Sequence, residues 1–323
     1  MYSIVAKKPG DVSVLKRADL DLPRLNSNEV LVKNKSIGVN FIDIYIRKGI
    51  YPWPQEQNLV LGSEASGEIE AVGSDVKNFQ IGDRVAYAQA NNAYATHRVI
   101  DEKFVVSIPE SISFNQAASA MLKGLTVKCL LLDSFKLKPH HKVLFHAAAG
   151  GVGLIAGQWI KSIGSHLIGT ASSDLKCGIA IDYGYSKMIN YTNNKFLDEV
   201  QFLTNNEGVD VVYDSVGKDT MFDSFNCLKK HGTLVSFGQS SGIYKKLQMS
   251  DLMPKSLYLT RPTLFHFYTN REWLIQSSKI LFKMIDEQKI VFKEVKEYKL
   301  EDVAQAHIDI ENRKTTGSVI LKT

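Results

Sequence analysis

A strand, a glycine-rich turn and a helix follow one another in residues 142–164, and this order constrains the fold more than any other feature. The segment reads KVLFHAAAGGVGLIAGQWIKSIG. Val152, Ile155, Trp159, Ile160 and Ile163 recur at helical spacing on one face, and Gly164 is placed to end the helix. A strand that passes through small residues into a helix is typical of α/β sheets that bind nucleotides.

The rest of the chain shows two kinds of periodicity. Up to about residue 120, short apolar strands alternate with glycine turns, which predicts an antiparallel sheet or partial barrel. From Lys142, six apolar runs begin at residues 142, 166, 187, 209, 233 and 256, and helical stretches separate the first five. This alternation predicts an α/β fold with a doubly wound, parallel, six-stranded Rossmann sheet.

The final strand-like run, GSVILKT, follows a long helical stretch that begins near residue 271. Because the parallel sheet is already six strands wide, we assign this run to the first, mostly β domain. The expected domains are therefore residues 1–122 with 266–323, and residues 123–265.

Composition excludes several classes of protein. The 39 Lys and Arg residues against 34 Asp and Glu give a net charge of +5 that is spread along the chain, too diffuse for a nucleic-acid footprint. No window reaches the roughly 18 apolar residues that a membrane span needs, so we expect a cytoplasmic protein. Cys129, Cys177 and Cys227 lie far apart and favour reduced thiols over a disulfide framework or metal cluster.

The turn departs from the dinucleotide pattern GxGxxG at one position, because Ala148 occupies the place of the first glycine. An alanine is tolerated there while its φ stays negative. Gly150 allows a pyrophosphate to approach the backbone, and Gly153 lets helix and strand pack closely. With Gly151 and Val152, these residues start a helix whose N–H groups face the phosphates.

The end of the second strand favours NADPH over NADH. NAD-binding folds usually place an acid there for the ribose hydroxyl, whereas this strand ends in Ala171, Ser172 and Ser173. Lys176 supplies a positive charge for a 2′-phosphate and Ser172 a hydroxyl donor; the alternative is that Lys176 is a solvated surface lysine. We interpret the nearby Asp174 as the N-cap of the following helix.

Ligands of such sheets lie at the carboxyl ends of the strands, which makes the following turns candidate cofactor contacts. Each turn alone is also explained by ordinary turn chemistry. The residues are Tyr191, Ser215, Gly217, Phe237, Gly238 and Gln239.

Four segments together resemble the medium-chain dehydrogenase/reductase superfamily. They are GVNFIDIYIRKGIYP, LGSEASGEIEAVGSDVKNFQIGDRVAY, HAAAGGVGLIAGQ and VVYDSVG. Within the superfamily the chain resembles the bacterial NADPH:quinone oxidoreductases related to zeta-crystallin. The resemblance covers essentially the whole chain and implies a GroES-like catalytic domain, interrupted by the Rossmann domain, with the site in the cleft between them.

Zinc alcohol dehydrogenases of this superfamily carry a cysteine and a histidine as ligands where this chain has Asn40 and Ser63. Glu64 and Asp43 remain, but two carboxylates without soft or imidazole ligands make a poor zinc site, so we expect no metal. Hydride addition to a quinone leaves a phenolate-like oxygen near pKa 10, whereas an aldehyde leaves an alkoxide. The difference is roughly 8 kcal/mol of charge stabilisation that a quinone does not require.

The resemblance places Asn40, Tyr45 and Tyr51 around the nicotinamide and the substrate. An amide and two phenols offer hydrogen-bond donors and flat faces to a quinone, although the tyrosines alone would also serve to cover the domain junction. Catalysis then rests on positioning and on hydride transfer, which belongs to the cofactor.

Matched motif positions add further cofactor contacts, for which Arg313 has a solvated loop position as its alternative. They are Phe41, Tyr45, Pro262, Thr263, Leu264 and Arg313. Lys123 and Thr126 begin the helix that joins the domains, and a purely structural role would account for both residues. Two interpretations of Arg261 are open: its side chain points into the cleft, or it supports the edge at which a dimer forms. The resemblance implies a homodimer that pairs strands at Leu257–Thr260.

The leading hypothesis is an NADPH-dependent, zinc-free quinone reductase acting on a small molecule. Its closest rival is an NADPH-dependent alkenal or enone reductase on the same scaffold. A third hypothesis, of a different class, is a non-catalytic role as a lens-type structural protein or an RNA-binding protein, against which the diffuse charge argues.

Overall fold

The computed structural model describes residues 1–54 and 58–323, which form two compact units. Unit 1 contains Met1–Leu125, Phe265–Gln288 and Phe292–Thr323. Unit 2 contains Thr126–Leu264 and Lys289–Val291.

Unit 2 is built on a parallel sheet of six strands within the described residues, in the order β11-β10-β9-β12-β13-β14. The strands are β9 (Lys142–Phe145), β10 (His166–Ala171), β11 (Lys187–Asn190), β12 (Val209–Asp214), β13 (Leu228–Ser236) and β14 (Tyr258–Thr260). The sequence prediction of a doubly wound parallel sheet is confirmed.

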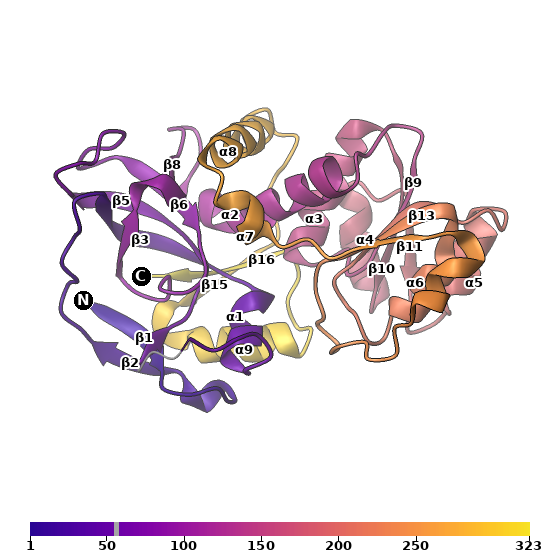
Figure 1. Ribbon diagram of the computed structural model, residues 1–323, viewed down its shortest axis with the longest axis horizontal. Coiled ribbons are helices and arrows are strands. Elements are labelled where there is room, and N and C mark those ends of the chain that lie inside the picture. The colour runs from indigo at the N-terminus through magenta and orange to yellow at the C-terminus, as the bar shows by residue number, and fades with distance from the viewer. Residues whose placement is uncertain (55–57) are drawn as a thin grey trace. The chain divides into compact units, whose positions relative to one another are not determined.

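Helices cover both faces of this sheet, which explains why its strands are apolar on both sides. Helices α3 and α4 lie together on one face, and α5 and α6 on the other (Figure 1). The elements are α3 (Gly151–Ile163), α4 (Asp174–Asp182), α5 (Phe196–Leu203), α6 (Met221–Cys227), a π-helical segment η3 (Cys129–Ser134) and a 3-10 segment η4 (Met249–Lys255).

Helix α3 follows the expected pattern. Ile155, Trp159 and Ile160 are buried, and Gly164 ends the helix in the left-handed region with φ 89°. The turn at residues 146–150 is therefore held between a core strand and a core helix.

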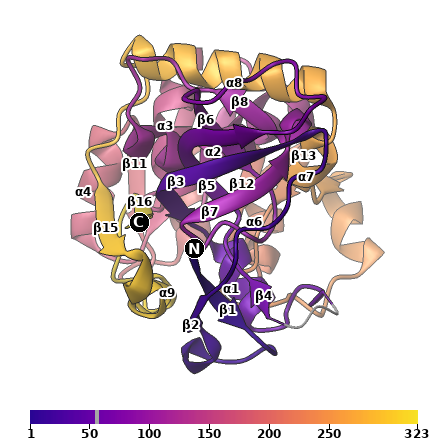
Figure 2. The same ribbon diagram turned by 90° about the vertical axis from the view of Figure 1, so that its left-hand side faces the viewer.

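Unit 1 is mostly β. Its main sheet has the order β15-β16-β3-β5-β6-β8, with β7 also pairing with β3, and a smaller sheet has the order β2-β1-β4 (Figure 2). The strands are β1 (Tyr2–Ala6), β2 (Lys16–Asp19), β3 (Glu29–Val39), β4 (Leu59–Val60), β5 (Glu64–Val72), β6 (Arg84–Ala88), β7 (His97–Asp101), β8 (Val105–Ser107), β15 (Val295–Lys299) and β16 (Ser318–Lys322). All pairs except β15 with β16 are antiparallel, as predicted.

The C-terminal strand β16 pairs with β3, so the run GSVILKT belongs to unit 1. The core combines strand residues such as Val32, Ile69 and Leu321 with residues of α1 and α9. The helical elements are α1 (Phe41–Arg47), α2 (Phe114–Lys128, which runs on into unit 2), α7 (Leu264–Tyr268), α8 (Arg271–Asp286), α9 (Val303–Glu311) and the 3-10 turns η1 (Val12–Val14), η2 (Glu102–Phe104) and η5 (Leu300–Asp302).

Two further features concern the whole described chain. No helix among the described residues is long and apolar enough to cross a membrane. Cys129, Cys177 and Cys227 are all free thiols, and Cys129 and Cys227 are buried, which raises the pKa of both.

Candidate active site

The glycine-rich turn of unit 2 has the geometry expected for close approach to a ligand. Gly150 is the N-cap of α3, and a Cβ added there would meet only the Ala147 carbonyl oxygen, at 3.3 Å. At Gly153 a Cβ would lie 2.4 Å from the Ala148 carbonyl oxygen, so helix and strand pack as predicted. Ala148 stays outside the left-handed region; the positive φ, 55°, falls on Ala147, which the sequence pattern did not reveal.

A cluster of buried polar side chains, which was not identified from the sequence, holds the first residue of this turn. His146, at the end of β9, lies 2.9 Å from the Thr170 hydroxyl and 3.0 Å from the Ser224 hydroxyl. Ser224 donates to Asp214 at 3.1 Å, and Asp214 also accepts the Gly217 N–H at 3.0 Å. Burial lowers the pKa of His146. The cluster thereby links the ends of three neighbouring strands.

One residue at the end of β10 has a different role from the one expected. Asp174 is not the N-cap of α4; Ser173 is, and its hydroxyl accepts the Lys176 N–H at 3.3 Å. Ser173 has the extended backbone of an N-cap, with φ −162°, whereas Asp174 is already helical. The Asp174 carboxylate instead accepts a hydrogen bond from Asn190 at 2.8 Å. Lys176 lies in the first turn of α4 and is half-buried.

The remaining turns predicted in unit 2 meet at the same edge of its sheet. Tyr191 follows β11, and its N–H donates to Ala171 at 3.1 Å. The Phe237 N–H donates to Asp214 at 2.8 Å, and a Cβ on Gly238 would lie 2.7 Å from the Ser215 carbonyl oxygen. Ser215, Gly217, Gly238 and Gln239 therefore form adjoining turns, while Pro262, Thr263 and Leu264 follow β14.

Arg261 supports one of these turns. Its guanidinium donates to the Ser236 hydroxyl at 2.8 Å, to the Gly238 carbonyl at 3.3 Å and to the Gln239 side chain at 3.1 Å. Neither interpretation of Arg261 that the sequence left open included these hydrogen bonds, because no local sequence pattern indicates them.

In unit 1, Asn40 belongs to a buried charged cluster. It is the N-cap of α1, and its amide nitrogen donates to Glu64 Oε2 at 2.8 Å. Lys123 Nζ donates to the same oxygen at 2.9 Å, and the Leu122 N–H to Oε1 at 3.0 Å. Glu64 and Lys123 are almost completely buried. From the sequence we assigned Lys123 a purely structural role. The available signal for this ion pair was Glu64, an acid for which the sequence offered neither a metal nor a counter-charge.

The second carboxylate, Asp43, is surrounded by hydrogen-bond donors. It accepts bonds from the Ser63 hydroxyl at 2.6 Å, the Tyr94 hydroxyl at 2.9 Å and the Asn40 N–H at 2.9 Å. Burial outweighs these bonds and raises the pKa of Asp43 to about 6. Both carboxylates are thus engaged, and among residues 1–54 and 58–323 no group of three His, Cys, Asp or Glu side chains is placed to hold a metal ion.

The predicted aromatic residues form one cluster next to Asn40. The ring centroid of Tyr45 lies 5.9 Å from that of Phe41 and 5.1 Å from that of Tyr51. Tyr45 is buried and Tyr51 half-buried. Arg313 lies elsewhere in unit 1, exposed just beyond α9 and with a left-handed φ of 58°.

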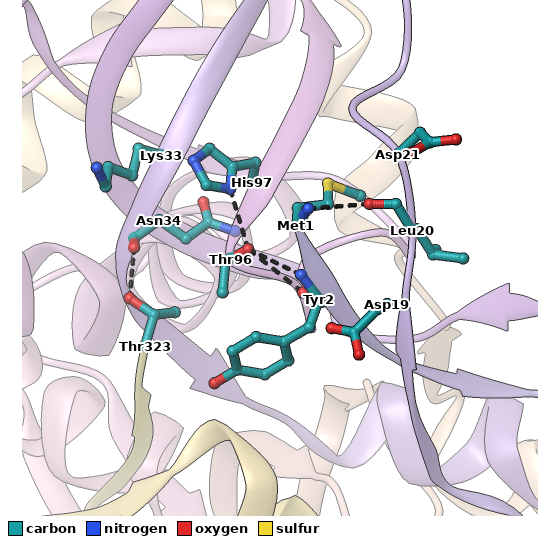
Figure 3. A pocket seen from close by; sticks show the side chains of 10 residues that line it. All are labelled: Met1, Tyr2, Asp19, Leu20, Asp21, Lys33, Asn34, Thr96, His97 and Thr323. Carbon is teal, nitrogen blue, oxygen red and sulfur yellow. Dashed lines mark hydrogen bonds between the residues drawn. The ribbon is translucent and has the colours of Figure 1, made fainter.

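A groove of about 560 Å³ in unit 1 is lined by none of these residues (Figure 3). Its polar groups are hydrogen-bonded to one another, as where Thr96 accepts the Tyr2 N–H and Thr323 donates to the Asn34 carbonyl. It is lined by Met1, Tyr2, Asp19, Leu20, Asp21, Lys33, Asn34, Thr96, His97 and Thr323.

Known proteins resemble this chain over almost its entire length. Residues 26–110 match the family described as alcohol dehydrogenase GroES-like domain, and residues 151–279 match the zinc-binding dehydrogenase family. Quinone oxidoreductase 1 of Escherichia coli is 44% identical, over 97% of both chains. A 2-haloacrylate reductase of Burkholderia is 36% identical over 99% of this chain and 98% of the relative. The crystal structure of Escherichia coli quinone oxidoreductase complexed with NADPH has a TM-score of 0.95 and 42% identity, and the match covers 100% of both chains.

Proposed function

Because the chain belongs to the zinc-free NADPH:quinone oxidoreductase family of the medium-chain dehydrogenases/reductases, we propose that it reduces a quinone with NADPH and without a metal. The observation that carries this proposal is the 44% identity to a quinone oxidoreductase along 97% of the chain. Bound NADPH supplies a hydride; with one proton from solvent, the quinone becomes a hydroquinone and NADPH becomes NADP⁺.

The edge of the sheet in unit 2 fits this cofactor. The backbone N–H groups of Gly151, Val152 and Gly153 start α3 without helical partners and hold the pyrophosphate beside Gly150. Ser172 and Lys176 hold the 2′-phosphate. The contacts along the rest of this edge are Tyr191, Ser215, Gly217, Phe237, Gly238, Gln239, Pro262, Thr263 and Leu264.

Unit 1 supplies the residues proposed to contact the substrate and the nicotinamide side of the cofactor. Tyr45 and Tyr51 offer aromatic faces and phenol groups, and Asn40 offers its amide, whose orientation Glu64 fixes. Phe41 and Arg313 complete the cofactor contacts. A hydroquinone oxygen near pKa 10 tolerates negative charge, so the neutral side chains of Asn40, Tyr45 and Tyr51 suffice on the substrate side.

The test is the rate of NADPH oxidation by the purified protein with a panel of quinones and a panel of 2-alkenals and 2-haloacrylates. Faster turnover with quinones is expected. The similarity to the Burkholderia 2-haloacrylate reductase makes activity on the second panel the alternative. Faster turnover with 2-alkenals or 2-haloacrylates would reassign the protein as an enone reductase. Failure to oxidise NADPH with any acceptor would favour the non-catalytic hypothesis.

Replacing Lys176 with glutamate is expected to weaken NADPH binding at least about tenfold and to leave NADH binding within about twofold, because a carboxylate repels the 2′-phosphate. Fluorescence titration of both nucleotides measures the effect. The control is Lys187→Glu, which makes the same change of charge at an exposed position on β11. Equal losses for NADPH and NADH would contradict the assignment.

We also propose a cytoplasmic homodimer, paired along β14, which with β11 is one of the two outer strands described in its sheet. Large apolar side chains near this edge are exposed: Tyr258 by 62%, Met249 by 82% and Met253 by 76%. Light scattering after size exclusion is expected to give a dimer for the native protein and a monomer for Tyr258→Glu. A monomeric native protein would overturn the pairing.

A further inference from the structure

A continuous chain of buried hydrogen bonds joins α1 to α9 inside unit 1, where the two helices lie beside each other (Figure 1). Arg47 lies 3.2 Å from His307 Nδ1, and His307 Nε2 lies 2.9 Å from the Tyr94 hydroxyl. Tyr94 in turn donates to Asp43 Oδ2 at 2.9 Å. Each of these four side chains is at most 1% exposed.

The chemistry of the groups gives this chain one direction. A guanidinium can only donate, so Nδ1 of His307 must accept from Arg47, and the ring hydrogen is on Nε2. That hydrogen points to the Tyr94 oxygen, which leaves the Tyr94 hydrogen for Asp43. Burial, together with the charges of Arg47 and Lys48, lowers the pKa of His307 to about 3, so the imidazole is neutral near pH 7.

This chain of hydrogen bonds holds both ends of α1. Asp43 and Arg47 lie one helical turn apart on the same face, and Tyr94 and His307 bridge them. Asp43 also accepts the N–H of Asn40 at 2.9 Å, which fixes the start of the helix. Arg47 also donates to Glu311 at 2.8 Å, at the last residue of α9.

A helix as short as α1 has no stability of its own, so its position depends on such contacts. Asn40 is its N-cap, and the helix carries Tyr45; both residues are proposed to contact the quinone. His307 contacts Arg47 and Tyr94, and it acts on Asn40 and Tyr45 through them.

We propose that His307 is a positioning residue for quinone reduction, which holds α1, and with it Asn40 and Tyr45, through a neutral imidazole that donates to Tyr94 and accepts from Arg47. The inference rests on the proposed quinone reductase activity. It assigns to α9 a role in the reaction although its side chains need not touch the substrate.

The test compares His307→Phe, which keeps a ring of similar size without hydrogen bonds, with His307→Gln, which keeps one donor and one acceptor. His307→Phe is expected to lower kcat/KM for a quinone on the order of 10- to 100-fold, because small displacements of contact residues are costly. The Kd of NADPH measured without quinone should change far less than kcat/KM, since the proposed phosphate contacts lie in unit 2 and α1 supplies only Phe41 and Tyr45 to the cofactor. His307→Gln is expected to recover most of kcat/KM.

Ile69→Ala, a cavity-forming change in the same core, is the control for destabilisation and is expected to keep kcat/KM at a temperature where it is folded. Unchanged kcat/KM in His307→Phe, or a loss in His307→Gln or Ile69→Ala as large as that in His307→Phe, would overturn the positioning role. If His307→Phe does not fold, His307→Gln and the imidazole ¹⁵N shifts of the native protein decide. A hydrogen on Nε2 from pH 6 to 8 supports the role, and one on Nδ1 overturns it. Native protein inactive with quinones but with this tautomer would refute the proposed function instead.

Discussion

Replacing Lys123 with methionine is expected to lower the free energy of unfolding by about 3–5 kcal/mol, because it leaves the buried carboxylate of Glu64 without a counter-charge. Lys123 donates to Glu64 Oε2 at 2.9 Å, and Glu64 is fully buried. Urea unfolding at pH 7, followed by circular dichroism, measures the loss. Activity should fall as well, because the same oxygen orients the Asn40 amide.

The matched control is the double variant Lys123→Met/Glu64→Gln. The glutamine oxygen still accepts the Leu122 N–H, and its NH2 group faces the Asn40 side chain, whose amide can flip to offer its oxygen. The double variant should therefore recover much of the stability that the single variant loses. If the single variant unfolds at the same urea concentration as the native protein, the ion pair does not stabilise the fold. If the double variant is no better than the single one, the uncompensated charge is not the cause.

Gly153→Val is expected to weaken NADPH binding on the order of 100-fold, the cost of misplacing a binding element by about 1 Å. The added Cβ would lie 2.4 Å from the Ala148 carbonyl oxygen and 2.5 Å from that of Ala147, so the start of α3 must move away from the turn. Fluorescence titration with NADPH measures the effect, and circular dichroism checks that the variant remains folded.

Gly178→Ala provides the control for this second substitution. Gly178 lies in α4, and an added Cβ there would meet no atom within 4 Å. That variant should bind NADPH as the native protein does and gain roughly 0.5–1 kcal/mol of stability from the better helix propensity of alanine. Native-like NADPH affinity in Gly153→Val would remove the turn from the cofactor site.

The two substitutions probe features that differed in how visible they were in the sequence. Gly153 was identified from spacing alone, because close packing of a helix on a strand excludes a side chain at a fixed offset in the turn. The partner of Lys123 was not, because Glu64 lies 59 residues away and no periodicity connects the two. The hydrogen bonds by which Asn40 engages Glu64 and Ser63 engages Asp43 were likewise not foreseen.

Small local errors have a similar origin. Serine and aspartate are both good N-caps, so the sequence could not decide between Ser173 and Asp174; the backbone at Ser173 decided it. In the glycine turn, the left-handed conformation falls on Ala147, although alanine has no intrinsic preference for it. The surrounding strand and helix impose that conformation.

The sequence by itself determined the features set by short-range sterics and by the period of apolar residues. These are the parallel and antiparallel strands, the glycine turn that starts α3, and the absence of an acid at the end of β10. Only the tertiary structure decided which polar groups meet in the core, as when His307 joins Arg47 across 260 residues and Lys123 meets Glu64. Local patterns specify elements because each residue restricts its own backbone. Buried polar pairs depend on how whole elements pack, because a charge or donor removed from water must find its partner wherever the fold brings one.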